Sequence, residues 1–280
     1  MTGATGFIGR YVVAELARRG VSPVIVCRPS TAVPAELSAH PIVHCDIDDA
    51  RDDSFARAGS PDLLIHLAWN GLPNYRSLHH FDRELPSQYA FLRRWIESGL
   101  AACLVTGTCF EYGNQSGALA EDLPARPTNP YGFAKDALRQ QLAYLRGQRP
   151  FRLTWARLFY LWGDGQASSS LWSQLKQAVA QRQAEFPMSG GEQLRDYLPV
   201  TRVAAYVVDL ALSDVDPGIV NICSGVPTSV RSLVERWIAE NGWPIVPALG
   251  RFPYPDYEPM AFWGDARKLH ALVSAANKDQ

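Results

Sequence analysis

A tyrosine and a lysine four residues apart, Tyr131 and Lys135, are the first residues whose types and spacing suggest chemistry. On a helix this spacing places both side chains on one face, one turn apart. An ammonium beside a phenol favours the phenolate, so we expect Lys135 to lower the tyrosine pKa from its usual value of about 10. Such a tyrosine can exchange a proton with a carbinol or carbonyl oxygen. This pair indicates a catalytic site only if a dinucleotide site and a hydroxyl residue accompany it.

A glycine-rich run at the start of the chain is the candidate dinucleotide site. Gly3 permits a tight turn, Gly6 lets the backbone approach a pyrophosphate, and Gly9 allows close helix packing. A helix is expected over residues 11–19, so its N-terminus faces the phosphates. The apolar run at 24–27 then reads as the second strand of a βαβ unit.

The strand that should precede this glycine turn is almost missing. Only Met1 and Thr2 stand before Gly3, although that strand is central to the sheet in this kind of fold. We expect either a chain that starts a few residues short, with weakened stability, or a central strand reduced to a stub.

The end of the second strand indicates the cofactor. An acidic residue there would bind the ribose 2′-hydroxyl of NAD, but this chain has Arg28, whose guanidinium matches a 2′-phosphate. Arg10 can assist. We therefore expect NADP(H) as the preferred cofactor, with NAD(H) as the alternative.

Composition excludes several classes of function. The chain has 280 residues, 47% of them hydrophobic, and a net charge of −1, so it has a core but no basic field for nucleic acid. Its apolar runs are too short to cross a membrane. Five scattered cysteines without a C-x-x-C spacing predict neither a disulfide framework nor a metal site, and favour a reducing, cytoplasmic setting.

Further apolar runs predict a parallel sheet. Near-continuous apolar stretches are typical of parallel strands buried on both faces, and they lie at 42–47, 63–69, 102–106 and 219–225. His66 falls inside one of them and is interpreted as structural. Residues 70–82 are expected to form a polar loop over the active site. Its adjacent His79 and His80 would point apart on a helix, so no metal site is expected.

The second half of the chain is expected to bind the substrate. A loop over 163–170 and a helix over 171–183 lead to a glycine turn that delivers Arg195. The aromatic, proline-rich tail at 253–259, with Phe262 and Trp263, either lines a sugar pocket or packs under a C-terminal lobe.

Together these motifs resemble the extended short-chain dehydrogenase/reductase family of nucleotide-sugar enzymes, the NAD-dependent epimerase/dehydratase group. Thr108 stands where that family has its catalytic Ser/Thr, four residues before Tyr112-Gly113. The resemblance implies a Rossmann-type, doubly wound α/β fold with a smaller C-terminal substrate lobe. It divides the chain into a dinucleotide-binding domain at 1–157, joined by 198–225, and a substrate lobe at 158–197 and 226–280.

The resemblance also implies roles for individual residues. Thr108, Tyr131 and Lys135 are the expected catalytic residues: the hydroxyl positions the substrate oxygen, the phenol exchanges its proton, and the lysine also binds the nicotinamide ribose. The expected cofactor contacts are Gly3, Thr5, Gly6, Phe7, Ile8, Gly9, Arg28, Asp46, Ile47, Leu67, Ala68, Trp69, Tyr131, Lys135 and Leu158. The expected substrate contacts are Thr108, Cys109, Tyr160 and Arg195, and Arg195 is expected to grip the diphosphate.

Departures from the family pattern narrow the reaction. The 4,6-dehydratases carry an Asp-Glu pair where this chain has Cys109 and Phe110, and Glu111 is one place too late and would face the wrong way. The 4-epimerases usually carry Asn in place of Tyr160. The remaining patterns resemble 4-keto reductases of the CDP-abequose synthase type, which act on a nucleotide-linked 4-keto-6-deoxyhexose.

Two other functions stay open. One is a 4-epimerase with tightly bound NAD, and the other is a non-catalytic dinucleotide-binding sensor. The family usually forms homodimers through the helix that carries Tyr131 and its neighbour near 85–98. Apolar residues on the first of these helices suit that arrangement, namely Phe133, Ala134, Ala137 and Leu138.

Overall fold

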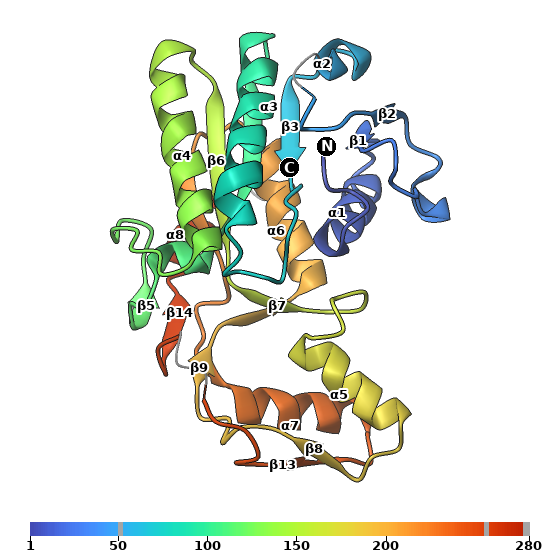
Figure 1. The fold of residues 1–280 in the computed structure, drawn as a ribbon, viewed down its shortest axis with the longest axis vertical. Helices are drawn as coiled ribbons and strands as arrows, with labels where there is room; N and C mark the ends of the chain where they lie inside the picture. The colour runs from blue at the N-terminus through green and yellow to red at the C-terminus, as the bar shows by residue number, and fades with distance from the viewer. Residues whose placement is uncertain (50–52, 255–257, 277–280) are drawn as a thin grey trace.

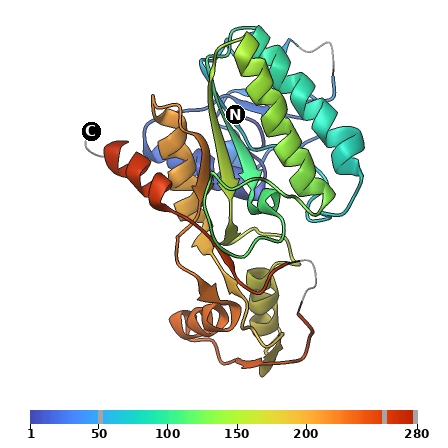
Figure 2. The same ribbon diagram turned by 90° about the vertical axis from the view of Figure 1, so that its left-hand side faces the viewer.

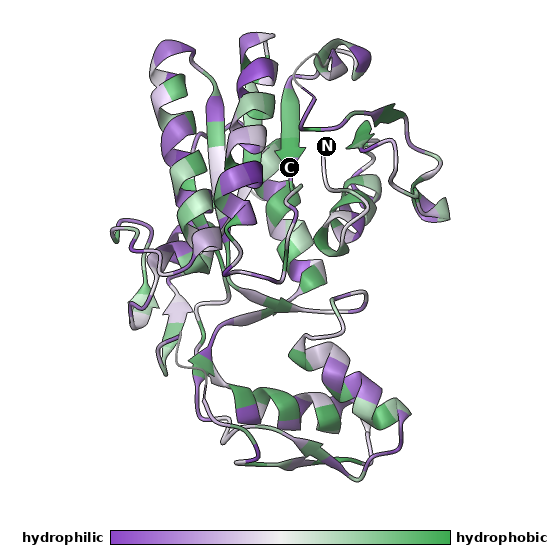
Figure 3. Ribbon diagram, viewed as in Figure 1, coloured by the Kyte–Doolittle hydropathy of each residue, from purple (hydrophilic) through white to green (hydrophobic). Residues whose placement is uncertain are grey.

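A parallel sheet covered by helices on both faces forms the larger of two lobes, and a smaller lobe lies below it (Figure 1). The computed structural model describes residues 1–49, 53–254 and 258–276. The strands of the main sheet are β1 (Ile25–Cys27), β2 (Ile42–His44), β3 (Leu63–His66), β4 (Ala102–Thr108), β6 (Arg152–Leu158) and β11 (Gly218–Ile222). They confirm the apolar runs predicted as strands, and Figure 3 shows β3 coloured as hydrophobic along its length.

Met1 and Thr2 take the place of the central strand. Strands β11, β6, β4 and β3 pair in parallel in that order, and β1 pairs in parallel with β2. Thr2 joins the two groups through parallel bridges to Val26 in β1 and His66 in β3. Met1 and Thr2 therefore fill the central position of the sheet with two residues.

Helices on opposite faces enclose two cores. One face carries α1 (Phe7–Arg18), α6 (Val200–Leu212) and α8 (Arg267–Ala276), and the other carries α3 (Leu85–Glu97) and α4 (Pro130–Gln148), as Figure 2 shows. The short α2 (Ser54–Arg57) lies between β2 and β3 in the chain. Val12, Leu16 and Val207 are fully or almost fully buried in the first core, and Phe91 and Leu142 in the second. This three-layer arrangement is the expected Rossmann-type α/β fold.

A third, smaller core holds the lower lobe together. Tryptophan rings fill it, with Trp172 and Trp237 buried and 5.0 Å apart between ring centres. The elements of this lobe and of the border with the larger one are β5 (Gly117–Leu119), β7 (Tyr160–Trp162), α5 (Leu171–Ala180), β8 (Glu185–Pro187), β9 (Leu194–Arg195), β10 (Tyr197–Pro199), β12 (Thr228–Ser229), α7 (Val230–Asn241), β13 (Val246–Ala248) and β14 (Phe262–Gly264).

Two expectations need correction. The segment expected as a loop ends in a π-helical turn, η2 (His80–Glu84), which runs directly into α3. Pro86 lacks an N–H and its ring crowds the preceding turn, and this explains the wider turn. The second correction concerns α8, which was assigned to the substrate lobe. It packs on the larger lobe instead, because its Leu269 is buried in the core of that lobe. The rest of the expected lobe division stays a proposal.

Candidate active site

Thr108 lies at the end of β4, where a short helical turn, η3 (Cys109–Tyr112), begins. Its hydroxyl accepts a hydrogen bond from the Phe110 amide at 3.3 Å, and the Glu111 carboxylate accepts one from the Thr108 amide at 2.8 Å. This reciprocal pair is a capping box. The backbone of Thr108 is therefore fixed at the carboxyl end of a central strand, where parallel sheets place their active sites.

Tyr131 reaches the same point from the first turn of α4. The Asn129 side chain caps this helix by accepting a hydrogen bond from the Gly132 amide at 2.8 Å. The Tyr131 phenol lies close enough to the Thr108 side chain for that hydroxyl to act on its pKa. Its ring lies 5.9 Å from Trp69 and 5.3 Å from His80 between ring centres. The structure thus brings together the phenol and the hydroxyl that the sequence paired.

Lys135 does not act on Tyr131 as predicted. Its ammonium donates to the carbonyl oxygen of Thr106 at 2.9 Å and lies 4.0 Å above the Trp69 ring, but 6.0 Å from the centre of the Tyr131 ring. Burial raises the pKa of Tyr131 above its usual value, so the expected lowering is wrong for this structure. Burial also lowers the pKa of Lys135 to about 7.

The chemical consequence is a phenol that keeps its proton. At neutral pH Tyr131 is an acid beside a hydroxyl, and both can hydrogen-bond one oxygen atom. Lys135 changes charge close to neutral pH. The site is therefore suited to give a proton to an oxygen that gains negative charge.

The glycine turn packs as closely as the sequence required. Gly3 has a φ of +72°, and a Cβ on it would lie 2.8 Å from the Ala68 amide nitrogen. A Cβ on Gly9 would lie 2.0 Å from the carbonyl oxygen of Gly3, so only glycine allows α1 to start so close to the turn. The N-terminus of α1 then opens towards a cleft, an arrangement that favours phosphate.

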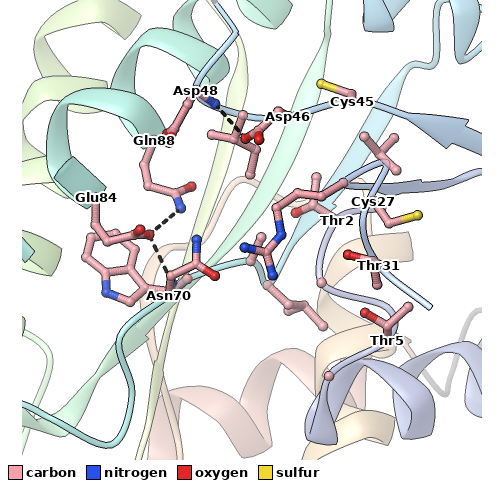
Figure 4. A pocket seen from close by; sticks show the side chains of 18 residues that line it. Thr2, Thr5, Cys27, Thr31, Cys45, Asp46, Asp48, Asn70, Glu84 and Gln88 are labelled. Carbon is pink, nitrogen blue, oxygen red and sulfur yellow. Dashed lines mark hydrogen bonds between the residues drawn. The ribbon is translucent and has the colours of Figure 1, made fainter. Parts of the chain in front are cut away.

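The cleft is shown in Figure 4. Of the expected cofactor contacts, nine line it: Gly3, Thr5, Gly6, Arg28, Asp46, Ile47, Leu67, Ala68 and Trp69. Phe7, Ile8, Gly9, Leu158, Tyr131 and Lys135 do not line it. Trp69 connects the cleft to Tyr131 and Lys135, because its ring contacts both of them. A glycine turn, a helix N-terminus and polar side chains in one cleft fit a dinucleotide.

Several polar residues of the cleft escaped sequence reasoning. Glu84 accepts hydrogen bonds from the Asn70 amide and from Gln88, both at 3.0 Å, and all three side chains line the cleft (Figure 4). Gln88 also bonds His66 at 2.6 Å, and His66 bonds Thr2 at 2.9 Å. His66 is therefore structural, as predicted. The π-helical turn that presents Glu84 has no sequence signal of its own.

Arg28 lies exposed and lines the cleft together with Thr31 and Asp46. Arg10, expected to assist, does not line the cleft. It forms an ion pair with Glu36 at 3.8 Å. Of the two arginines that the sequence predicted to bind the cofactor, Arg28 therefore lines the cleft and Arg10 does not.

The expected substrate contacts gather around a residue that the sequence did not single out. Glu258 accepts a hydrogen bond from the Tyr160 hydroxyl and pairs with Arg195 at 3.0 Å. The Arg195 guanidinium lies 4.5 Å above the Phe262 ring. Cys109 is buried, and this burial raises the pKa of its thiol.

The tail therefore contacts two of the expected substrate residues, because Glu258 bonds Tyr160 and Arg195, and Phe262 lies against Arg195. Of the expected tail segment, residues 255–257 lie outside the described residues. The diphosphate role expected for Arg195 remains a prediction, since the arginine is already paired with a carboxylate in this structure.

In the described ranges 1–49, 53–254 and 258–276, no group of three or more His, Cys, Asp or Glu side chains is arranged to hold a metal ion. Nor do these ranges contain a helix that combines the length and the apolarity needed to cross a bilayer.

Comparison with known proteins agrees with this geometry. The sequence profile of the NAD dependent epimerase/dehydratase family matches residues 1–223. A dTDP-6-deoxy-L-talose 4-dehydrogenase (NAD(+)) of Aggregatibacter actinomycetemcomitans is 33% identical over 266 residues, 94% of this chain and 98% of the relative. A UDP-glucose 4-epimerase of Azospirillum brasilense is 28% identical over 89% of this chain and 78% of its own.

A solved structure of similar fold is MoeE5 in complex with UDP-glucuronic acid and NAD. It superimposes with a TM-score of 0.81 at 25% identity, covering 98% of this chain and 91% of that chain.

Proposed function

Because the chain belongs to the NAD dependent epimerase/dehydratase family, we propose that it reduces the 4-keto group of a nucleotide-linked 4-keto-6-deoxyhexose, with Tyr131 as proton donor. It is an NAD-dependent nucleotide-sugar enzyme of the epimerase, dehydratase or dehydrogenase type, and the proposal concerns which of these reactions it performs. The observation that carries it is the buried, protonated phenol of Tyr131 on Thr108, beside the cleft.

Each residue of the site has a task in this reaction. A bound nicotinamide dinucleotide supplies the hydride for the carbonyl carbon. Thr108 orients the C4 oxygen through its hydroxyl, and Tyr131 donates the proton as that oxygen gains charge. The nearby Lys135 ammonium stabilises negative charge that develops at the oxygen. Gly3, Gly6 and the N-terminus of α1 would hold the pyrophosphate.

The position of Glu111 supports reduction over dehydration. Its carboxylate is fully buried and bonded to Arg157 at 2.6 Å, so it is not presented to a substrate as an acid or base. The relative at 33% identity is named for oxidation at C4 of a 6-deoxyhexose, which is the reverse of the proposed step. The second candidate is a 4-epimerase with tightly bound NAD, supported by the UDP-glucose 4-epimerase among the relatives.

The test is turnover on a panel of CDP-, GDP-, dTDP- and UDP-4-keto-6-deoxysugars, each with NADH and NADPH. We expect stoichiometric consumption of reduced cofactor with one of them. Co-purifying NAD and interconversion of 4-hydroxy sugars without net consumption would favour the epimerase. No turnover of any nucleotide sugar would overturn the proposal and favour the non-catalytic sensor.

The variant Tyr131→Phe should lower turnover by at least about 100-fold while cofactor affinity changes little, because it removes the proton and keeps the ring. Cofactor affinity is measured by quenching of protein fluorescence. Phe133→Leu, on an exposed face of the same helix, is the matched control and should keep full activity. Normal activity of Tyr131→Phe would rule out the assigned proton donor.

We further propose that NADP(H) is preferred, with Arg28 binding the 2′-phosphate at the rim of the cleft. Arg28→Ala should raise KM for NADPH by about tenfold, the loss of one charge-assisted hydrogen bond, and leave KM for NADH unchanged. Equal KM values for both cofactors in the unmodified enzyme, or a preference for NADH, would refute this; the relative at 33% identity is named for NAD(+).

The proposed assembly is a homodimer through α3 and α4, for which exposed aromatic side chains provide the support. Phe133 on α4 is 52% exposed, and Phe81, 36% exposed, packs its ring 5.3 Å away. Ala134 and Leu138, which the sequence assigned to this face, are fully buried inside the chain and contribute nothing to it.

A further inference from the structure

A carboxylate with no assigned task lies directly beneath the catalytic turn. Glu111 is fully buried, and its oxygens accept hydrogen bonds from the Trp155 indole at 3.0 Å and from the Arg157 guanidinium at 2.6 Å, besides that from the Thr108 amide. Every hydrogen bond that it receives from the described residues comes from an N–H donor. Burial raises the pKa of Glu111, and the Arg157 charge together with the hydrogen bonds from Arg157, Thr108 and Trp155 opposes that rise. Because every one of these partners donates a hydrogen bond or carries a positive charge, the arrangement favours the carboxylate over the acid.

The backbone around this carboxylate leaves no room for variation. A Cβ on Gly107 would lie 2.4 Å from the Glu111 carboxylate and 2.3 Å from the Trp155 nitrogen. On the same strand end, the Lys135 ammonium binds the Thr106 carbonyl at 2.9 Å. The cation from α4 and the anion from η3 therefore hold two consecutive peptide groups at the end of β4.

Arg157 extends the contact to the helix that carries Tyr131. Its guanidinium lies 3.9 Å from the Asp136 carboxylate, and Asp136 follows Lys135 directly on α4. It also lies 4.5 Å above the ring of Tyr112 at the end of η3. One buried ion pair thus joins β6, η3 and α4, the three elements that meet at the site.

We propose that Glu111 is a positioning residue, whose carboxylate fixes Thr108 against Tyr131 and whose negative charge keeps Tyr131 and Lys135 protonated between turnovers. The first part follows from its hydrogen bond to the Thr108 amide. The second follows from its place beneath both groups, because a buried anion disfavours the phenolate and favours the ammonium. The charge of Glu111 acts in this direction on the pKa of Tyr131 and on that of Lys135.

Other groups face the pair from the neighbouring elements, and the test has to separate them from Glu111. The groups that act on Tyr131 or Lys135 are Tyr75 from the loop before η2, His80 and Glu84 from η2, His66 from β3, and Cys109 from η3. Glu84 is the second anion near Lys135, so its effect has to remain when Glu111 is neutralised.

The decisive experiment titrates Lys135 directly by NMR. The chain has only four lysines, at 135, 176, 268 and 278, so 13Cε labelling gives four signals, and Lys135→Met assigns the one of interest. Lys135 should titrate near pH 7 in the unmodified protein. In Glu111→Gln its midpoint should fall by about one pH unit. An unchanged midpoint would overturn the proposal.

Matched variants guard against trivial outcomes. Glu15→Gln removes one negative charge from α1, where Glu15 pairs with Arg18 and Arg19, and should leave the Lys135 midpoint unchanged. If Glu111→Gln does not fold, the double variant Glu111→Gln/Arg157→Gln removes the whole buried ion pair. The Lys135 midpoint should then fall in the same direction but by less, because the loss of the Arg157 cation on its own raises that midpoint. A Lys135 midpoint equal to that of the unmodified protein in that variant would equally refute the role.

A kinetic arm rests on the proposed function. In Glu111→Gln the alkaline limb of kcat/KM should move to lower pH by about the same amount, because both proton-bearing groups lose protons sooner. A purely structural role would lower kcat/KM at every pH without moving the limb. If the unmodified enzyme reduces no sugar, the proposed reaction fails, whereas the NMR titration still decides the role of Glu111.

Discussion

His66 shows how one buried side chain links stability to pH. It is buried between Thr2 and Gln88, and burial lowers its pKa from 6.5 to about 3. In the folded chain it stays neutral, whereas the unfolded chain takes up a proton below pH 6.5. Stability is therefore lost as the pH falls from about 6.5 towards 3, because the unfolded state binds the extra proton.

We expect this single group to lower the free energy of unfolding by about 2 to 3 kcal/mol between about pH 7.5 and about pH 4.5. Denaturant unfolding at both pH values measures it. His66→Gln should lose that much less stability over the same interval, while His270→Gln, exposed on α8, should follow the unmodified protein. If His66→Gln and the unmodified protein showed the same pH dependence of stability, the predicted contribution of neutral, buried His66 would be wrong.

Residue types and spacing predicted the partners of the site but not their protonation. The contact between Thr108 and Tyr131 follows from a strand end and a helix start that family-like motifs mark. The pKa of Tyr131 depends on the rings of Trp69, Tyr75 and His80 that exclude water from it, and these come from other segments. Local sequence contains no measure of that burial, so the sign of the shift could not be predicted.

At the scale of elements, α3 and α4 carry the surface on which the proposed dimer depends. Phe133→Asp should convert the dimer to a monomer, because it places a charge in a desolvated apolar contact. Size-exclusion chromatography with light scattering gives the mass of the unmodified protein and of the variant. Val226→Asp changes an exposed apolar residue in the smaller lobe and should leave the mass unchanged. A monomeric unmodified protein would remove the basis for this assembly.

Periodicity predicted the elements better than their ends. The apolar runs became β1, β2, β3, β4 and β11, since strands buried on both faces need such sequences. The π-helical turn before α3 was missed, because its cause is a single proline and its hydrogen-bond pattern has no periodic signature. That turn presents Glu84 to the cleft, so the error at an element boundary hid a residue of the site.

At the scale of the whole molecule, the site is assembled from segments far apart in the chain. Thr108 comes from the middle of the larger lobe, Arg195 from β9, and Glu258 from near the end. Sequence motifs around Thr108 and Arg195 predicted both of these residues as part of the candidate site. The contact of Glu258 with Tyr160 spans 98 residues, and only the folded chain reveals it.

The stub at the centre of the sheet has a consequence for the whole molecule. Among the described residues, Met1 and Thr2 form the junction between β1 and β3. The Val26 N–H donates to the Met1 carbonyl at 2.8 Å, and the Thr2 N–H donates to the Ile65 carbonyl at 3.0 Å. The cleft lies across this junction, with Gly3 and Arg28 on one side and Leu67 and Trp69 on the other. A dinucleotide bound there would contact both sides of the junction. Its binding would therefore also stabilise the pairing of β1 with β3 through Met1 and Thr2.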